Sequence, residues 1–195
     1  MRSQNQAEAI EIDASKEHEQ RIAEARQLCN RFKRVDFRTV SGRVFALTRG
    51  GDIKPARYAE VYILAPAYAR AVATEALESS TAQMRELVEK KLLTSTSEFV
   101  PTLDRLQVLN HRLALVKAAS EIREQVGGCA SELFTATDLE GNFEIRGVPP
   151  AELWVYVVGR AGGNQAVWSS KIDVKPRQQI RIEMHSPDYS FLDIE

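Results

Sequence analysis

Hydrophobic and polar positions alternate along a short segment in the second half of the chain. Phe143 and Ile145 are apolar, whereas Asn142, Glu144 and Arg146 are polar. A period of two residues is typical of a β-strand that buries one face only. The pattern therefore predicts a strand in a sheet with one face turned toward a hydrophobic core.

Turn and stop signals stand on either side of this strand. Asp138 and Gly141 are residue types that form tight turns, and we expect the Asp138 side chain to close a hairpin turn there. The acidic run could also suggest a calcium loop, but the twelve-position ligand pattern of such loops is absent. Pro149 and Pro150 cannot donate to a sheet ladder, so the strand must end before them.

Six further segments have the composition and alternation of strands, and glycine or proline turn signals separate most of them. The seven predicted strands cover residues 37–48, 58–64, 132–137, 142–148, 152–158, 165–174 and 178–184. Seven short strands with such turns predict an antiparallel sandwich of two sheets.

Three longer segments show the period of an α-helix. Residues 5–34 have a thin apolar stripe, with acids at the start and basic residues at the end, which matches the helix dipole. A thin stripe cannot stabilise a helix alone, so this helix should pack on the rest of the chain or on another copy. The alternative is a partly frayed, solvated leader. The acids are Glu8, Glu11, Asp13, Glu17 and Glu19.

Two helical segments separate the second predicted strand from the third. Each is about 25 residues, and the short polar connector 94–98 predicts that they lie antiparallel as a hairpin. In the second helix the apolar stripe begins with Leu106, Leu109, Leu113 and Val116, and Ala119, Ile122 and Val126 continue it. Both stripes are broad enough to serve a partner helix as well as each other, as in a bundle or short coiled coil.

The predicted fold class is therefore α+β, a seven-stranded antiparallel β-sandwich with an inserted antiparallel helical hairpin and an N-terminal helix. The expected division is an N-terminal helix at 1–35, a sandwich formed by 36–66 and 130–186, a hairpin insertion at 67–129, and a loose acidic tail at 187–195.

Composition excludes some classes of function. The formal net charge of the 195 residues is −1, and no basic stripe with interleaved aromatics appears, which argues against nucleic-acid binding. No apolar run approaches the roughly 20 residues needed to span a membrane. The polar start has no signal peptide, so the expected compartment is the cytoplasm; an extracytoplasmic location is the alternative if the sequence is a trimmed piece of a longer protein.

Candidate reactive groups are scattered. His18, His111 and His185 fall in three different predicted elements, so neither a metal site nor a catalytic site is expected, and no cofactor is implied. Cys29 and Cys129 lack CxxC spacing, and we interpret both as buried thiols. Pairing between them would require close approach of their α-carbons, which a sequence cannot establish.

Two blocks of the sequence resemble the carboxypeptidase regulatory-like domain, a transthyretin-like sandwich of the Ig-like type. The residues that carry the resemblance are SGRVF at 41–45, KPA at 54–56, EVYIL at 60–64, TDLEGNF at 137–143, GVPP at 147–150 and LWVYV at 153–157. The resemblance implies a non-catalytic module, usually an accessory or adhesive domain on bacterial extracytoplasmic proteins. Some uncharacterised bacterial proteins look similar even in carrying long helices after the second strand.

One candidate binding surface is aromatic. If Leu153, Val155 and Val157 face the core, strand alternation places Trp154 and Tyr156 on the opposite face. Exposed neighbouring aromatics could bind a glycan or a peptide, whereas the alternative is that the chain's own helices cover them.

We interpret the chain as a non-catalytic structural or interaction protein. It displays the helical hairpin for self-assembly or for docking of a protein partner, with the stripe Leu106, Leu109, Leu113 and Val116 as the candidate surface. A carbohydrate- or peptide-binding accessory module that uses Trp154 and Tyr156 is the alternative.

Overall fold

The chain forms three helices and eight strands in the part that the structure describes. The computed structural model describes residues 2–32, 38–48, 50–92, 95–127, 133–175 and 179–192. The elements are α1 (Arg2–Phe32), β1 (Thr39–Leu47), β2 (Ile53–Leu64), α2 (Pro66–Glu89), α3 (Thr96–Gln125), β3 (Phe134–Ala136), β4 (Asn142–Arg146), β5 (Glu152–Ala161), β6 (Asn164–Asp173), β7 (Ile180–Met184) and β8 (Tyr189–Leu192).

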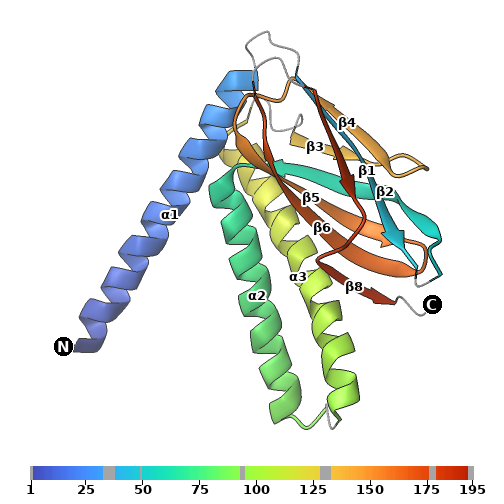
Figure 1. Cartoon of the computed structure of the whole chain (residues 1–195). Coiled ribbons are helices and arrows are strands. Elements are labelled where there is room, and N and C mark those ends of the chain that lie inside the picture. Colours follow the sequence, from blue (N-terminus) through green and yellow to red (C-terminus); the bar gives the residue numbers. More distant parts are fainter. Residues whose placement is uncertain are drawn as a thin grey trace.

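The strands form two layers, and pairing between β1 of one layer and β2 of the other connects them. In one layer β1 lies between β4 and β7, and in the other β2 is followed by β5, β6 and β8, with β3 on the outer edge of β2. The ends of β1 and β2 pair with each other and join the layers. Figure 1 shows the helices on one side of this sheet structure.

Side chains from both halves of the predicted sandwich meet in one hydrophobic cluster. Val40 and Val44 of β1 pack in the same cluster as Val155 of β5 and Trp168 of β6, and all four are fully buried. Burial of these side chains supplies the main driving force for folding. The predicted fold class, α+β with a sandwich of strands and an inserted helical hairpin, is confirmed.

Three details of the sheet differ from the prediction. The tail expected to be loose contains a strand, β8, which pairs antiparallel with β6. Tyr189 of this strand packs against His111 of α3, with their ring centroids 4.9 Å apart. The acidic composition of the tail concealed this aromatic contact. Strand β7 runs parallel to β1 instead of antiparallel. Strand β2 begins at Ile53 instead of residue 58, because a β-bulge interrupts its alternation.

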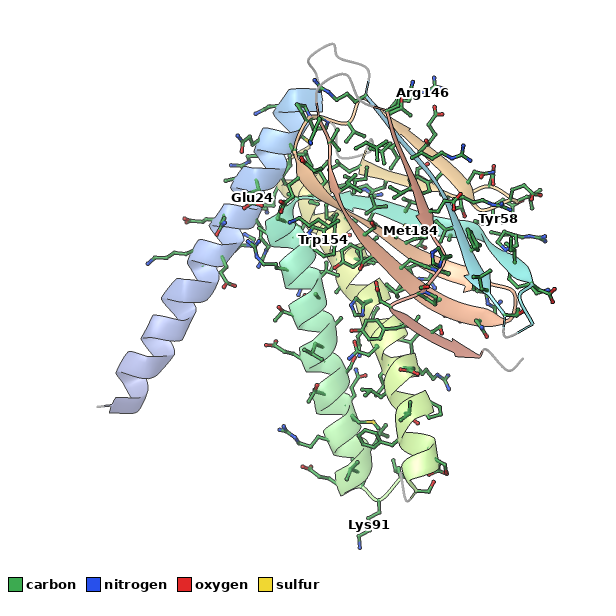
Figure 2. All side chains as sticks on the ribbon, in the orientation of Figure 1. Glu24, Tyr58, Lys91, Arg146, Trp154 and Met184 are labelled. Atoms are coloured by element: carbon green, nitrogen blue, oxygen red, sulfur yellow. The ribbon has the colours of Figure 1, made fainter. Side chains whose placement is uncertain are left out.

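Helices α2 and α3 form the predicted antiparallel hairpin, which extends beyond the sheet (Figure 1). Between them Asn110 donates to Ser80 Oγ at 2.9 Å and to Gln83 Oε1 at 3.1 Å. Helix α2 begins with Pro66 and has no side-chain cap of its own. Instead Glu24 of α1, labelled in Figure 2, accepts a hydrogen bond from the Ala67 amide at 3.0 Å, where a carboxylate is favoured by the helix dipole.

The structure corrects the interpretation of Cys29 as a buried thiol. The residue is buried near the C-terminal end of α1 and is disulfide-bonded. The other cysteine of the chain, Cys129, lies outside the described residues. The spacing of cysteines in a sequence does not reveal which α-carbons approach each other, so this bond was not predictable.

Candidate functional site

Helix α3 has a packing face that differs from the first part of its predicted apolar stripe, residues 106–116. The buried residues of this face include Val108, His111, Leu115 and Ile122. His111 Nδ1 lies 2.8 Å from the Gln107 carbonyl oxygen, and burial lowers the pKa of its imidazole. Buried histidine and asparagine side chains are tolerated here because their polar atoms have hydrogen-bond partners.

The first part of the predicted stripe of α3 lies mainly on the outside of the molecule, whereas its continuation at Ala119 and Ile122 is buried. Leu109, Leu113 and Val116 are 38%, 66% and 47% exposed, and Leu106 is half-buried. We call these four residues the α3 stripe. Their spacing of three and four residues places them along one side of the helix. From residue 106 to residue 116 the stripe is about 15 Å long at 1.5 Å per residue.

Basic side chains accompany the α3 stripe. Between residues 105 and 123 the helix has four basic residues of the Arg and Lys type, all exposed, against one acid, Glu121. Arg112 pairs with Glu60 at 3.1 Å and Lys117 with Glu75 at 2.8 Å, but exposed ion pairs of this kind contribute little to stability. The basic side chains beside the stripe are therefore exposed, and two of the four are paired with acids of β2 and α2.

Helix α1 packs on the hairpin through its second half. Among its described side chains, the buried ones are Ile22, Ala25, Leu28 and Cys29. Figure 1 shows that the N-terminal end of α1 lies apart from α2 and α3. Residues 2–20 contain five acids against two basic residues, Arg2 and Lys16.

A groove of about 1020 Å³ separates α1 from the hairpin where the three helices converge. On its walls, His18 Nδ1 lies 2.8 Å from Glu121 Oε1, and Arg21 lies 4.0 Å from the same oxygen. Tyr68 is buried at its base, where burial raises the pKa of its hydroxyl and the Arg21 guanidinium lies 5.9 Å from its ring centroid. These contacts attach α1 to the hairpin.

The aromatic pair predicted as a binding platform is largely covered. Trp154 and Tyr156 stack on each other with centroids 6.1 Å apart, but Tyr156 is only 5% exposed and its hydroxyl donates to the Ala69 carbonyl of α2 at 3.4 Å. Burial raises the pKa of Tyr156 to about 12. Trp154 is partly buried. The structure places α2 over this face, as the alternative interpretation expected.

The remaining sequence candidates are structural. Asp138 Oδ1 accepts from the amides of Glu140 and Asn142, both at 2.8 Å, so its side chain closes the hairpin turn as predicted. Among the described residues, no group of three or more His, Cys, Asp or Glu side chains could hold a metal ion. Within the same residues, no helix is long and apolar enough to cross a membrane.

Sequence reasoning missed one local feature, an exposed aromatic side chain on the bulge of β2. Tyr58, labelled in Figure 2, is 69% exposed and has a positive φ of 52°. The predicted strand began at this residue, so its alternation was taken to continue without interruption. The charged residues Arg57 and Glu60 on either side of an aromatic residue are the signal that could have indicated this exposed side chain.

Comparisons with known proteins give only remote similarities. No protein-family model matches the sequence, and no curated protein matches it. Among solved structures, one similar chain is a "putative carbohydrate binding protein" from Pseudomonas aeruginosa, with 10% identity, a TM-score of 0.40, and coverage of 79% of this chain and 91% of that one. Another is the pilus backbone RrgB from Streptococcus pneumoniae, with 11% identity, a TM-score of 0.24, and coverage of 76% of this chain and 41% of that one.

Similarities with TM-scores this low carry no argument about this chain. This chain also spans less than half of the pilus backbone structure. The resemblance to the carboxypeptidase regulatory-like domain stays a prediction, because no family model matches.

Proposed function

We propose that this chain is a non-catalytic interaction module that assembles with copies of itself through its helices. In this proposal the first half of α1 from one copy lies along the α3 stripe of another copy. The β-sandwich, which we propose to be of the carboxypeptidase regulatory-like type, serves as the rigid support that displays both helical surfaces.

The observation that carries the proposal is the exposure of Leu109, Leu113 and Val116 on a helix whose other face is already buried. Leaving neighbouring apolar side chains in water is unfavourable, and such patches on soluble proteins often mark interaction sites. The patch is long enough for about ten residues of a partner helix at 1.5 Å per residue.

Charge complementarity supports the first half of α1 from a second copy as the occupant. Basic residues accompany the α3 stripe, whereas the stretch 8–19 of α1 contains five acids and includes Ile10 and Ile12. Opposite charges across an interface accelerate association and select the partner. The end of α1 lies apart from its own hairpin (Figure 1), so it is available to a second copy.

We further propose that the protein works outside the cytoplasm. The disulfide at Cys29 supports this compartment, because thiols are kept reduced in most cytosols. Protein extracted from its native cells into an alkylating agent should carry no label on Cys29 before reduction and should be labelled after it. Complete labelling before reduction would contradict an oxidising compartment.

Light scattering coupled to gel filtration tests the assembly. The full chain should form oligomers whose fraction rises with concentration, and Leu113→Glu should shift it to monomer because an acid then opposes the acidic helix. Leu139→Glu is the matched control, since Leu139 is 53% exposed on the turn between β3 and β4, away from the helices. A full chain that remains monomeric at every accessible concentration, or a Leu113→Glu variant as oligomeric as the control, would refute the proposal.

A further inference from the structure

The groove between α1 and the helical hairpin is elongated. It lies where α1 diverges from α2 and α3 (Figure 1). The residues that line it are within 17–21 of α1, 67–78 of α2 and 114–124 of α3. A helix rises about 16 Å over the α2 segment, and the volume of about 1020 Å³ is at the upper end of the range for small-molecule sites. The groove therefore suits a long, linear ligand.

Small apolar side chains form the floor of the groove on the hairpin side. Ala67 of α2 and Ala114 and Ala118 of α3 are buried, and Ala71 is half-buried. We call these four residues the alanine floor. Methyl groups offer no hydrogen bonds, so this surface favours the methylene groups of an aliphatic chain, whose burial is favourable.

A buried hydroxyl group at the base of the groove lacks a partner. Tyr68 is 1% exposed, and its hydroxyl makes no hydrogen bond within the described part of the chain. Burial and, to a smaller degree, the charge of Glu121 raise the pKa of this hydroxyl, so it is neutral and its oxygen can accept a hydrogen bond. A buried polar group without a partner is unfavourable. A ligand with an N–H donor would satisfy it.

Carboxylates outnumber the cationic groups that line the groove. Five glutamates line it, against two arginines, one lysine and one histidine. Two of the glutamates have partners within the groove. Glu75 pairs with Lys117 at 2.8 Å, and Glu121 lies 2.8 Å from His18 Nδ1 and 4.0 Å from Arg21.

The other three glutamates have no ion-pair partner among the described residues. They are Glu17 of α1, Glu78 of α2 and Glu124 of α3, and all three are exposed. Arg70 is the cationic residue of the groove that takes part in neither ion pair, so the free charges are mainly negative and favour a cation. Within the described residues, no group of three or more acids, histidines or cysteines could hold a metal ion. Carboxylates spread over three helices suit several cationic groups on one chain.

We propose that this groove binds a linear polyamine, a chain of methylene groups that carries three or four ammonium groups. The methylene groups pack on the alanine floor, and the ammonium groups pair with Glu17, Glu78 and Glu124. One nitrogen donates a hydrogen bond to the Tyr68 hydroxyl oxygen. Because the carboxylates come from all three helices, the bound ligand joins α1 to the hairpin.

Equilibrium dialysis of the full chain with radiolabelled spermine at physiological ionic strength tests this proposal. Magnesium ions and an acetylated tetralysine amide, which has the same charge as spermine, are the competing ligands. We expect one spermine per chain, bound at least about tenfold more tightly than either competitor, because only spermine combines the charges with a thin aliphatic chain. Absence of spermine binding would refute the site. Equal binding of magnesium would indicate general attraction of cations, and equal binding of the peptide would refute the polyamine.

Paired substitutions of exposed acids separate the groove from the overall charge. A variant with both Glu78→Gln and Glu124→Gln should bind spermine about tenfold more weakly, since each exposed ion pair contributes only modestly. The matched control carries Glu89→Gln and Glu140→Gln, which remove two exposed acids outside the groove, and it should stay within about twofold of the parent. Equal weakening in the two variants would assign the effect to net charge and overturn the proposal.

Tyr68→Phe tests the base of the groove. It removes the hydroxyl but keeps the ring, so spermine should bind about fivefold more weakly while the free energy of unfolding is not lowered. A Tyr68→Phe variant that binds spermine like the parent would overturn this placement of the ligand. The groove does not include the α3 stripe, so Leu113→Glu should bind spermine like the parent even where it abolishes assembly. Failure of the assembly and failure of this site are therefore distinguishable.

Discussion

At the scale of single residues, Asp138 illustrates a contact that the sequence was sufficient to predict. Its carboxylate was expected to close the turn before β4, and it does so through the amides of Glu140 and Asn142. Such side-chain contacts span only two to four residues, so they depend on local sequence alone.

The same hydrogen bonds predict how acid affects the turn. The Asn142 amide holds the pKa of Asp138 below its ordinary value. A carboxylate with a lowered folded-state pKa stabilises the fold above its unfolded pKa, and this contribution is lost as the pH falls through the folded value. We expect Asp138→Asn to lower the urea midpoint at pH 7, and this deficit relative to the parent should shrink as the pH falls through the lowered pKa of Asp138. A deficit that stays the same at every acidic pH would mean that the charge plays no part.

Tyr58 illustrates the opposite case, because its conformation is imposed by residues far away in the sequence. Thr137 and Gly159 create the bulge, and no pattern around residue 58 reveals them. Period-two alternation assumes an uninterrupted strand, so the prediction misplaced the start of β2.

The backbone strain at Tyr58, caused by its positive φ, should lower the stability of the fold. We expect Tyr58→Gly to raise the free energy of unfolding by up to about 1 kcal/mol, since glycine accepts a positive φ at no steric cost. Tyr58→Ala keeps the steric penalty and should not be stabilised. Urea unfolding followed by circular dichroism measures both variants. Stabilisation of the alanine variant by the same amount would show that loss of the exposed ring, and not relief of strain, is responsible.

At the scale of elements, the bulge in β2 depends on the buried hydroxyl group of Thr137. Thr137→Val keeps the shape of the side chain but leaves the Ala59 amide without its acceptor. An unsatisfied buried donor costs about 1–3 kcal/mol, so the unfolding free energy should fall by that amount. Thr137→Ser keeps the hydroxyl and should lose less. Urea denaturation measures the unfolding free energy of both variants. Equal decreases in the two variants would show that packing, and not the hydrogen bond, is responsible.

Helix α3 shows where periodicity fails at the scale of an element. The most regular apolar spacing, Leu106 to Val116, is on the outside, and the inner face includes His111 and Asn110. These polar residues are buried because Ser80, Gln83 and the Gln107 carbonyl accept their hydrogen bonds. A hydrophobic pattern depends only on the polarity of each residue. It cannot predict that hydrogen-bond partners on another helix will allow a polar residue to be buried.

At the scale of the whole molecule, the disulfide at Cys29 restrains the end of α1 that packs on the hairpin. Loss of a native disulfide commonly costs about 2–5 kcal/mol, so Cys29→Ser should lower the unfolding free energy within that range. Reduction by dithiothreitol should lower the unfolding free energy of the parent by the same amount. It should not lower that of the Cys29→Ser variant any further. If the parent were insensitive to reductant, the bond would make no contribution to stability.

The proposed assembly joins two different surfaces, α1 of one copy and the α3 stripe of the next, and such a contact can be restored by complementation. A variant that lacks residues 2–14 retains the stripe, and the Leu113→Glu variant retains α1. Each variant should sediment as a monomer when it is measured separately. An equimolar mixture should form a one-to-one complex, because α1 of the Leu113→Glu variant can still bind the intact stripe of the truncated variant. Lower ionic strength should strengthen this complex, since acidic and basic side chains face each other across it. A mixture that sediments as two monomers at every salt concentration would show that α1 is not the occupant of the stripe.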